Sequence, residues 1–277
     1  MMPVYLIVGA LTRDVTEDGF RYGGSVLYAG LTALALGYKL KVVTTCHPEE
    51  PLGRLFPGAE IYLQESPETT TFVNLETRSG RRQQILANAR PLKVQGLPQE
   101  FLTADIVHLA PVADECPLEA LGLFSGQFVG ASIQGWLRTW DKKGLVRQKK
   151  VPPEVFSPLK ALVLSQEDLG GDLDYASELA RIVPLVVVTR DRHGAWLYHE
   201  GQRHHLPAPE VPVVDPCGAG DIFAAVFFSA LFEGLDPLKA VALANCLAAR
   251  SVTRKGLESI ALPEEIRDCY QTIAQQG

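Results

Sequence analysis

The sequence of 277 residues has no long apolar run, no excess of basic charge and no paired cysteine motif, and each absence excludes a class of protein. The first apolar run, residues 4–8, is too short for a membrane span or a signal peptide. A net charge of −6 argues against a general nucleic-acid binder. The five cysteines show no CxxC spacing, and we interpret them as reduced thiols. We therefore expect a soluble, cytoplasmic protein with no nucleic-acid or membrane partner.

Two nucleotide-binding motifs are also missing. The first apolar run continues as VGALTRDV, which lacks the glycines of the G-x-G-x-x-G turn of dinucleotide-binding proteins. No Walker A loop occurs, so a P-loop kinase is excluded, and a dinucleotide-dependent oxidoreductase is disfavoured.

Short runs rich in Val and Ile alternate with helix-like segments along most of the chain. Several runs are apolar at consecutive positions, which is typical of strands covered on both faces in a parallel sheet. The alternation predicts an α/β protein with right-handed βαβ connections. The predicted strands span residues 4–8, 40–45, 105–110, 128–133, 161–165 and 185–189.

Helix ends and exposed strands complete the predicted architecture. We expect one helix to be capped by Ser25 and closed by Gly37, and a later helix to begin at Asp236. Residues about 11–22 and 60–87 alternate apolar and polar positions, which predicts exposed antiparallel strands beside the main sheet. One domain spanning residues 1–277, with these two segments as a small lid, is the simplest interpretation.

The stretch VVDPCGAGDIFAAVFFSALFEG, residues 213–234, suggests a phosphate site. VPVV, residues 211–214, predicts a strand that leads into this stretch, DPCGAG predicts a turn and the rest predicts a buried helix. Unobstructed amides at a helix start, aided by the helix dipole, suit a phosphate group or its transition state. Asp221 at the same end can accept a proton from an attacking hydroxyl, as phosphoryl transfer to an alcohol requires. In the alternative, the glycines make a tight turn and Asp221 caps the helix.

The segment DPCGAGDIF resembles the D-T-x-G-A-G-D-x-F signature of the ribokinase-like (PfkB) carbohydrate kinases, with Pro216 in place of Thr. Four more segments resemble family motifs in the same order: GGSVLYAGLTALALG, TTTFVNLETRSGRRQ, VVVTRDRHGAWLY and SVTRKG. The resemblance implies a three-layer α/β/α sandwich with a mostly parallel sheet and a β lid. It also implies transfer of the ATP γ-phosphoryl group to a sugar, nucleoside or polyol hydroxyl with Mg²⁺, and in some members K⁺.

The resemblance also assigns roles to residues. Asp221 would be the base, and the amides of Gly218, Ala219 and Gly220 the anion hole. Asp168 would order Mg²⁺ through water, and Asp215 would hold a monovalent cation or cap its own turn. The acceptor-binding residues implied are Asp14, Gly23, Gly24 and Arg138, although Asp14 and Arg138 also fit surface roles; the nucleotide-binding residues implied are Ser165, Thr189, Arg190, Gly194, Asn245 and Gly256.

Three departures from the family pattern bear on these roles. SQED, residues 165–168, stands where the family has N-x-x-E, and Asp191 replaces the first glycine of T-x-G-x-x-G. Tyr28 stands where many sugar kinases carry an Asn that touches the sugar, which favours a different acceptor arrangement. These changes leave open a second hypothesis, a kinase-fold protein that binds a sugar or nucleotide without turnover. A homodimer formed through the lid strands is a further expectation.

Overall fold

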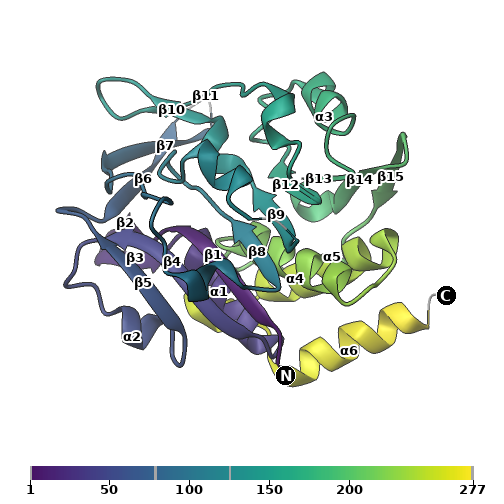
Figure 1. The fold of residues 1–277 in the computed structure, drawn as a ribbon. Helices are drawn as coiled ribbons and strands as arrows, with labels where there is room; N and C mark the ends of the chain where they lie inside the picture. Colours follow the sequence, from purple (N-terminus) through teal and green to yellow (C-terminus); the bar gives the residue numbers. More distant parts are fainter. Residues whose placement is uncertain (1, 78–79, 125, 276–277) are drawn as a thin grey trace.

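The computed structural model describes residues 2–77, 80–124 and 126–275, and a nine-stranded sheet forms its centre (Figure 1). The strand order is β15-β14-β13-β12-β9-β8-β1-β4-β5. The strands from β13 to β5 run parallel, and β14 and β15 add an antiparallel hairpin at one edge. All six predicted strands lie in this sheet, so the predicted mostly parallel α/β class is confirmed. The strands are β1 (Val4–Ala10), β4 (Lys39–Cys46), β5 (Glu60–Glu65), β8 (Ile106–Leu109), β9 (Phe128–Ser132), β12 (Ala161–Ser165), β13 (Leu185–Thr189), β14 (Ala195–His199) and β15 (Gln202–Leu206).

Both faces of the sheet are buried, which explains the unbroken apolar runs. Along β1, Tyr5 and Ile7 pack into one apolar cluster while Leu6 and Val8 pack into the other, because successive strand residues face opposite sides. The first cluster contains the helices α1 (Ser25–Ala35), α2 (Leu52–Leu55), α4 (Ala219–Phe232), α5 (Pro237–Ser251) and α6 (Pro263–Ala274). The second contains α3 (Leu173–Leu179) and residues of short 3₁₀ turns.

Helix α4 is enclosed by α1, α5 and the sheet, so its apolar sequence reflects burial on all sides. The ring of Phe228 lies directly over Gly130 of β9, where an added Cβ atom would come within 2.8 Å of it. This contact seats α4, and therefore its first turn, on the sheet.

Strands β2 (Thr12–Thr16), β3 (Gly19–Gly23), β6 (Thr70–Thr77) and β7 (Gly80–Ala87) form a separate small sheet that gathers at one side of the molecule (Figure 1). The predicted segment 60–87 is divided between the sheets, because residues 60–65 pair with β4 in the main sheet. The prediction of purely antiparallel pairing was wrong: β2 and β6 run parallel. A short hairpin of β10 (Arg138–Trp140) and β11 (Val146–Gln148) forms a third sheet and contacts β7 of the small sheet.

Several local predictions are corrected by tertiary contacts. Gly24, not Ser25, occupies the N-cap of α1 and has a φ of 90°. Gly37, which closes that helix, and the cap of Asp236 on α5 are as expected. No strand forms at VPVV, residues 211–214.

The prediction of reduced cysteines was wrong for one pair. Cys246 of α5 and Cys269 of α6 form a disulfide with a Cα–Cα distance of 6.0 Å. Their separation of 23 residues gave no sign of this, because only the packing of α6 against α5 brings the two side chains together. Cys46, Cys116 and Cys217 are free.

None of the helices within the described ranges is long and apolar enough to cross a membrane.

We expect Gly130→Ala to lower the free energy of unfolding by about 1–3 kcal/mol, because the new methyl group must displace the Phe228 ring. Gly122→Ala is the matched control, since nothing lies within 4 Å of the position that its new methyl group would take. Urea denaturation of both variants checks the difference, and equal midpoints would contradict the packing described for α4.

Candidate active site at the carboxyl edge of the sheet

The predicted site residues follow the carboxyl ends of several parallel strands. Asp14 comes shortly after β1, Ser165 ends β12 and Thr189 ends β13, while Asp221 lies in the first turn of α4. In open α/β sheets this edge is where ligands bind, because the loops there converge.

Asp221 is the most perturbed acid of the site. Burial raises the pKa of its carboxyl from 3.8 to about 6, against the lowering effects of a hydrogen bond from the Ser25 hydroxyl and the charge of Arg138. The charges of Asp168 and Asp14 raise this pKa further. The structure therefore brings together one base candidate, two further acids and one guanidinium from distant parts of the chain.

The turn before Asp221 exposes backbone amides. Among the described residues, the amides of Gly218 and Gly220 meet no hydrogen-bond acceptor, whereas Ala219 N donates a long bond of 3.3 Å to Pro216 O. Nothing lies within 4 Å of a Cβ atom built on Gly220, so a ligand has room there. Two of the three predicted anion-hole amides are thus free to bind an anion without rearrangement.

Gly218 is required for two reasons. Its φ of 78° lies in the left-handed region, and an added Cβ atom would meet the ring of Tyr28 at 2.3 Å. Tyr28 is 1% exposed and its ring packs against Gly218, so it supports this turn and is not exposed to an acceptor. At the position where the resemblance to sugar kinases predicts an Asn that touches the sugar, this chain therefore has a buried side chain that packs against the turn.

Arg138 faces the acids of the site. Burial lowers the pKa of its guanidinium, while the charges of Asp168, Glu167 and Asp221 oppose that effect. Its Nη1 donates a long bond of 3.4 Å to Val112 O. Arg138 is therefore a half-buried cation under the electrostatic influence of these acids.

The Gly23-Gly24 pair makes room for Asp14. An added Cβ atom on Gly23 would lie 2.7 Å from Asp14 Oδ2, and Gly24 has a φ of 90° and lies close to Ala10 O. The first glycine therefore admits the carboxylate of Asp14, and the second permits the backbone turn into α1.

Asp215 ties three segments together. Its Oδ2 accepts from Arg21 Nη1 at 2.8 Å and from Gly256 N at 3.3 Å, and its Oδ1 accepts from Cys217 N at 3.0 Å. The carboxylate thus caps its own turn, as one of the two sequence interpretations proposed, and it already has a cationic partner.

Asp168 folds back on its own turn. Its Oδ2 accepts from the backbone N and the Oγ of Ser165, at 2.8 and 2.7 Å. Its Oδ1 accepts no hydrogen bond from the described residues and is available to a water of hydrated Mg²⁺. Within the described ranges, no group of three or more His, Cys, Asp or Glu is arranged to hold a metal ion. Mg²⁺ usually keeps several waters and one or two carboxylates, which fits a single Asp168.

The remaining predicted nucleotide residues serve the fold in this structure. Asn245 donates to Leu206 O and Pro207 O, and Gly194 has a φ of 82° directly against Leu206 O. Thr189 Oγ1 donates to Leu164 O at 3.5 Å. The guanidinium of Arg190 lies 4.0 Å from the Trp196 ring centroid. No contact joins these four residues to Asp221 within the described part of the chain.

The altered glycine of the T-x-G-x-x-G segment has a local explanation. Asp191 has a φ of 48°, a conformation that favours glycine but that Asp also tolerates, and it is exposed. The departure at this position therefore preserves the backbone turn.

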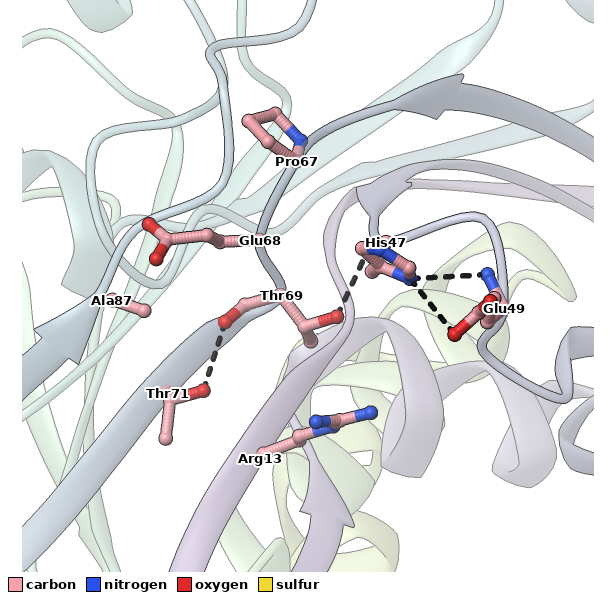
Figure 2. Close-up of a pocket in the computed structure, with 8 residues that line it drawn as sticks. All are labelled: Arg13, His47, Glu49, Pro67, Glu68, Thr69, Thr71 and Ala87. Atoms are coloured by element: carbon pink, nitrogen blue, oxygen red, sulfur yellow. Dashed lines mark hydrogen bonds and ion pairs between the residues drawn. The ribbon is translucent and has the colours of Figure 1, made fainter.

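A cavity of about 330 Å³ is lined by a different set of residues (Figure 2). Arg13, His47, Glu49 and Thr69 line it, with Arg13 projecting from β2. None of the predicted site residues contributes to its wall.

The sequence did not predict two contacts of the site. Ser25 hydrogen-bonds Asp221, although the sequence suggested a helix cap, and Arg21 pairs with Asp215 across 194 residues. Arg21 follows Asp14 in the predicted lid segment, but no pattern in the sequence indicated its partner.

Comparisons with known proteins find similarity to carbohydrate and nucleoside kinases. Residues 161–265 match the model of the pfkB family carbohydrate kinases. A cytidine kinase of Thermococcus kodakarensis is 25% identical over 279 residues, covering 90% of this chain and 96% of that protein. An inositol 3-kinase of Zea mays is 32% identical over 126 residues, covering 45% of this chain and 33% of that protein.

A solved structure shares the fold over nearly the whole chain. It is a pyrophosphate-dependent kinase in the ribokinase family, complexed with a pyrophosphate analogue and myo-inositol. The TM-score is 0.82 at 20% identity, covering 95% of this chain and 99% of that one. The chain is therefore similar in sequence to the pfkB family carbohydrate kinases over residues 161–265, and it shares the ribokinase-like fold over nearly its whole length.

Proposed function

We propose that the protein transfers the γ-phosphoryl group of ATP to a hydroxyl of a small sugar, nucleoside or polyol, with Asp221 as the general base. The observation that carries this proposal is the carboxyl of Asp221, with a pKa raised to about 6, in the same helix turn as the free amides of Gly218 and Gly220. A base with a pKa near neutral pH is well suited to proton transfer at physiological pH.

The chemistry divides between this base and the turn. Asp221 accepts the hydroxyl proton as the acceptor oxygen forms its bond to phosphorus, and the bond between phosphorus and the bridging oxygen breaks to release ADP. The amides of Gly218 and Gly220, with Arg138 nearby, stabilise the negative charge on the transferred group. Ser25 holds the carboxylate of Asp221 in place through its hydrogen bond.

ATP and Mg²⁺ fit the residues on the donor side. The open space at Gly220 admits a phosphate group, and the free Oδ1 of Asp168 can order a water of the hydrated metal. Mg²⁺ would neutralise charge on the phosphate oxygens. Ser165 orients Asp168 through two hydrogen bonds, and Arg190 lies at the end of the neighbouring strand.

The acceptor site of this proposal lies between Asp14 and Asp221. A carboxylate such as Asp14 can accept hydrogen bonds from two hydroxyl groups, which suits sugars, nucleosides and polyols alike. The relatives named above act on cytidine and inositol, so both compounds belong in the acceptor panel beside ribose and hexoses. Pyrophosphate is tested as a donor beside ATP, because a structural neighbour uses it.

We expect Asp221→Asn to lower kcat by about 10²- to 10⁴-fold, because the variant has no carboxylate to accept the hydroxyl proton. A coupled ADP assay over the acceptor panel measures it. If no acceptor or donor supports turnover by the unaltered protein, while ligands still raise its melting temperature, the protein binds without catalysis and the kinase proposal fails.

We expect kcat/KM to fall as the pH drops below about 6, where Asp221 takes up a proton.

The stability of the fold should show the opposite trend, because ionised Asp221 destabilises it as the pH rises. The folded state holds this proton more tightly than the unfolded chain, whose carboxyl has the ordinary value of 3.8, so ionised Asp221 costs stability above pH 6. Asp221→Asn should therefore be more stable at pH 8 by about 1–3 kcal/mol, with the gain lost below pH 4. Urea denaturation at both pH values checks this, and a gain independent of pH would contradict it.

A homodimer through the small sheet is also part of this proposal. Val15 and Phe20 stand opposite each other on β2 and β3 with exposed fractions of 38% and 45%. If this face joins two copies, Phe20→Asp should convert a dimer into a monomer in light scattering, because a charge would be buried at the interface. A dimer that survives this change uses another surface.

A further inference from the structure

Arg21 links the small sheet to the turn that precedes Asp221. It lies on β3, and its Nη1 is 2.8 Å from Oδ2 of Asp215. The side chain of Asp215 is 12% exposed and that of Arg21 is 37% exposed. The pair is therefore partly shielded from water, where ionic attraction is stronger than at a fully exposed surface.

Asp215 transmits the effect of this pair to the anion-binding turn. Its other oxygen accepts the amide of Cys217, the residue next to Gly218, and Oδ2 also accepts the amide of Gly256. A change in the position of this carboxylate would therefore move the backbone that presents the free amides.

Arg21 also stands beside the acceptor side of the site. It pairs directly with Asp14 across β2 and β3, so both side chains lie on the same face of the small sheet. Burial lowers the pKa of Arg21, but electrostatic interactions with Cys217, Asp215, Tyr28 and Asp14 outweigh that effect and raise it, which keeps the guanidinium charged. One guanidinium thus lies between the acid proposed to bind the acceptor and the acid that caps the anion-hole turn.

Without Arg21, Asp215 would be a poorly solvated carboxylate with two amide donors and no cation. Such a group is costly unless a counter-charge replaces the lost one. A small monovalent cation from solution could supply that charge, but in this chain the guanidinium already occupies the Oδ2 side of Asp215. The guanidinium of Arg21 therefore takes the place at Asp215 that the sequence analysis assigned to a monovalent cation.

We propose that Arg21 is a positioning residue. It supplies a fixed positive charge to Asp215 in place of a diffusible monovalent cation, and it thereby holds the anion-hole turn in place beside the small sheet. This inference rests on the proposed kinase function. Because Arg21 belongs to the small sheet, it reaches Asp215 only while that sheet stays packed against the turn.

The test compares Arg21→Ala with the unaltered enzyme in chloride salts of K⁺, Na⁺, choline and guanidinium, the last well below denaturing concentrations. The unaltered enzyme should show the same rate in the K⁺, Na⁺ and choline salts. Arg21→Ala should lose about 10- to 100-fold in kcat, because the amides are misplaced relative to the transferred group. Guanidinium or K⁺ should restore much of that loss, and neither should do so when Asp215→Asn is added.

The matched control is Arg13→Ala. Arg13 also belongs to the small sheet and pairs with a carboxylate, that of Glu50, at 2.8 Å, but it does not contact the turn. It should lower thermal stability while leaving kcat within about twofold and insensitive to guanidinium. Equal loss and rescue in both variants would show a general tethering effect and overturn the proposal.

Further outcomes separate this inference from the kinase proposal. If the unaltered protein phosphorylates an acceptor and Arg21→Ala does so equally well, or loses activity that no cation restores, the role of Arg21 is refuted while the kinase function stands. Thermal shift gives a reading without turnover: K⁺ or guanidinium should raise the melting temperature of Arg21→Ala more than that of the unaltered protein. Arg21→Gln, which keeps much of the length of the side chain, serves if the alanine variant does not fold, and its melting temperature should respond to cations in the same way.

Discussion

The burial of α4 is the constraint on which the site depends. Residues 222–230 of the helix are buried, and Phe228 lies against Gly130 on the sheet, so the sheet fixes where α4 and its first turn lie. That position places the carboxylate of Asp221 in a poorly solvated environment, which raises its pKa to about 6. The burial of α4 therefore has two consequences: it stabilises the core, and it raises the pKa of the carboxylate in the first turn.

The turn before α4 is held from three sides. Tyr28 packs beneath Gly218, Asp215 caps the amide of Cys217, and Arg21 reaches Asp215 from the small sheet. These contacts hold the backbone of the turn in place, so two of its amides have no partner among the residues that the structure describes. The free amides are consequently oriented before any ligand arrives, which is the condition for effective stabilisation of a transferred phosphoryl group.

The donor side differs more from the family pattern than the base does. Asp168 accepts two hydrogen bonds from Ser165 and has one oxygen with no donor among the described residues, and Asp191 adopts a positive φ of 48°. Both departures change the side chains that a donor would meet. Asn245 and Gly194 both contact Leu206 O at the end of β15, so they support the fold there.

The sequence alone determined the parallel strands and the role suggested for Asp221, because unbroken apolar runs and a Gly-Ala-Gly helix start are local patterns with local causes. It did not reveal the pairs Arg21–Asp215 and Cys246–Cys269, or the bond from Ser25 to Asp221. Each joins residues far apart in the chain and depends on how helices and sheets pack. Only the tertiary structure could decide these contacts, since a side chain's partner across the fold leaves no periodic signal in the sequence.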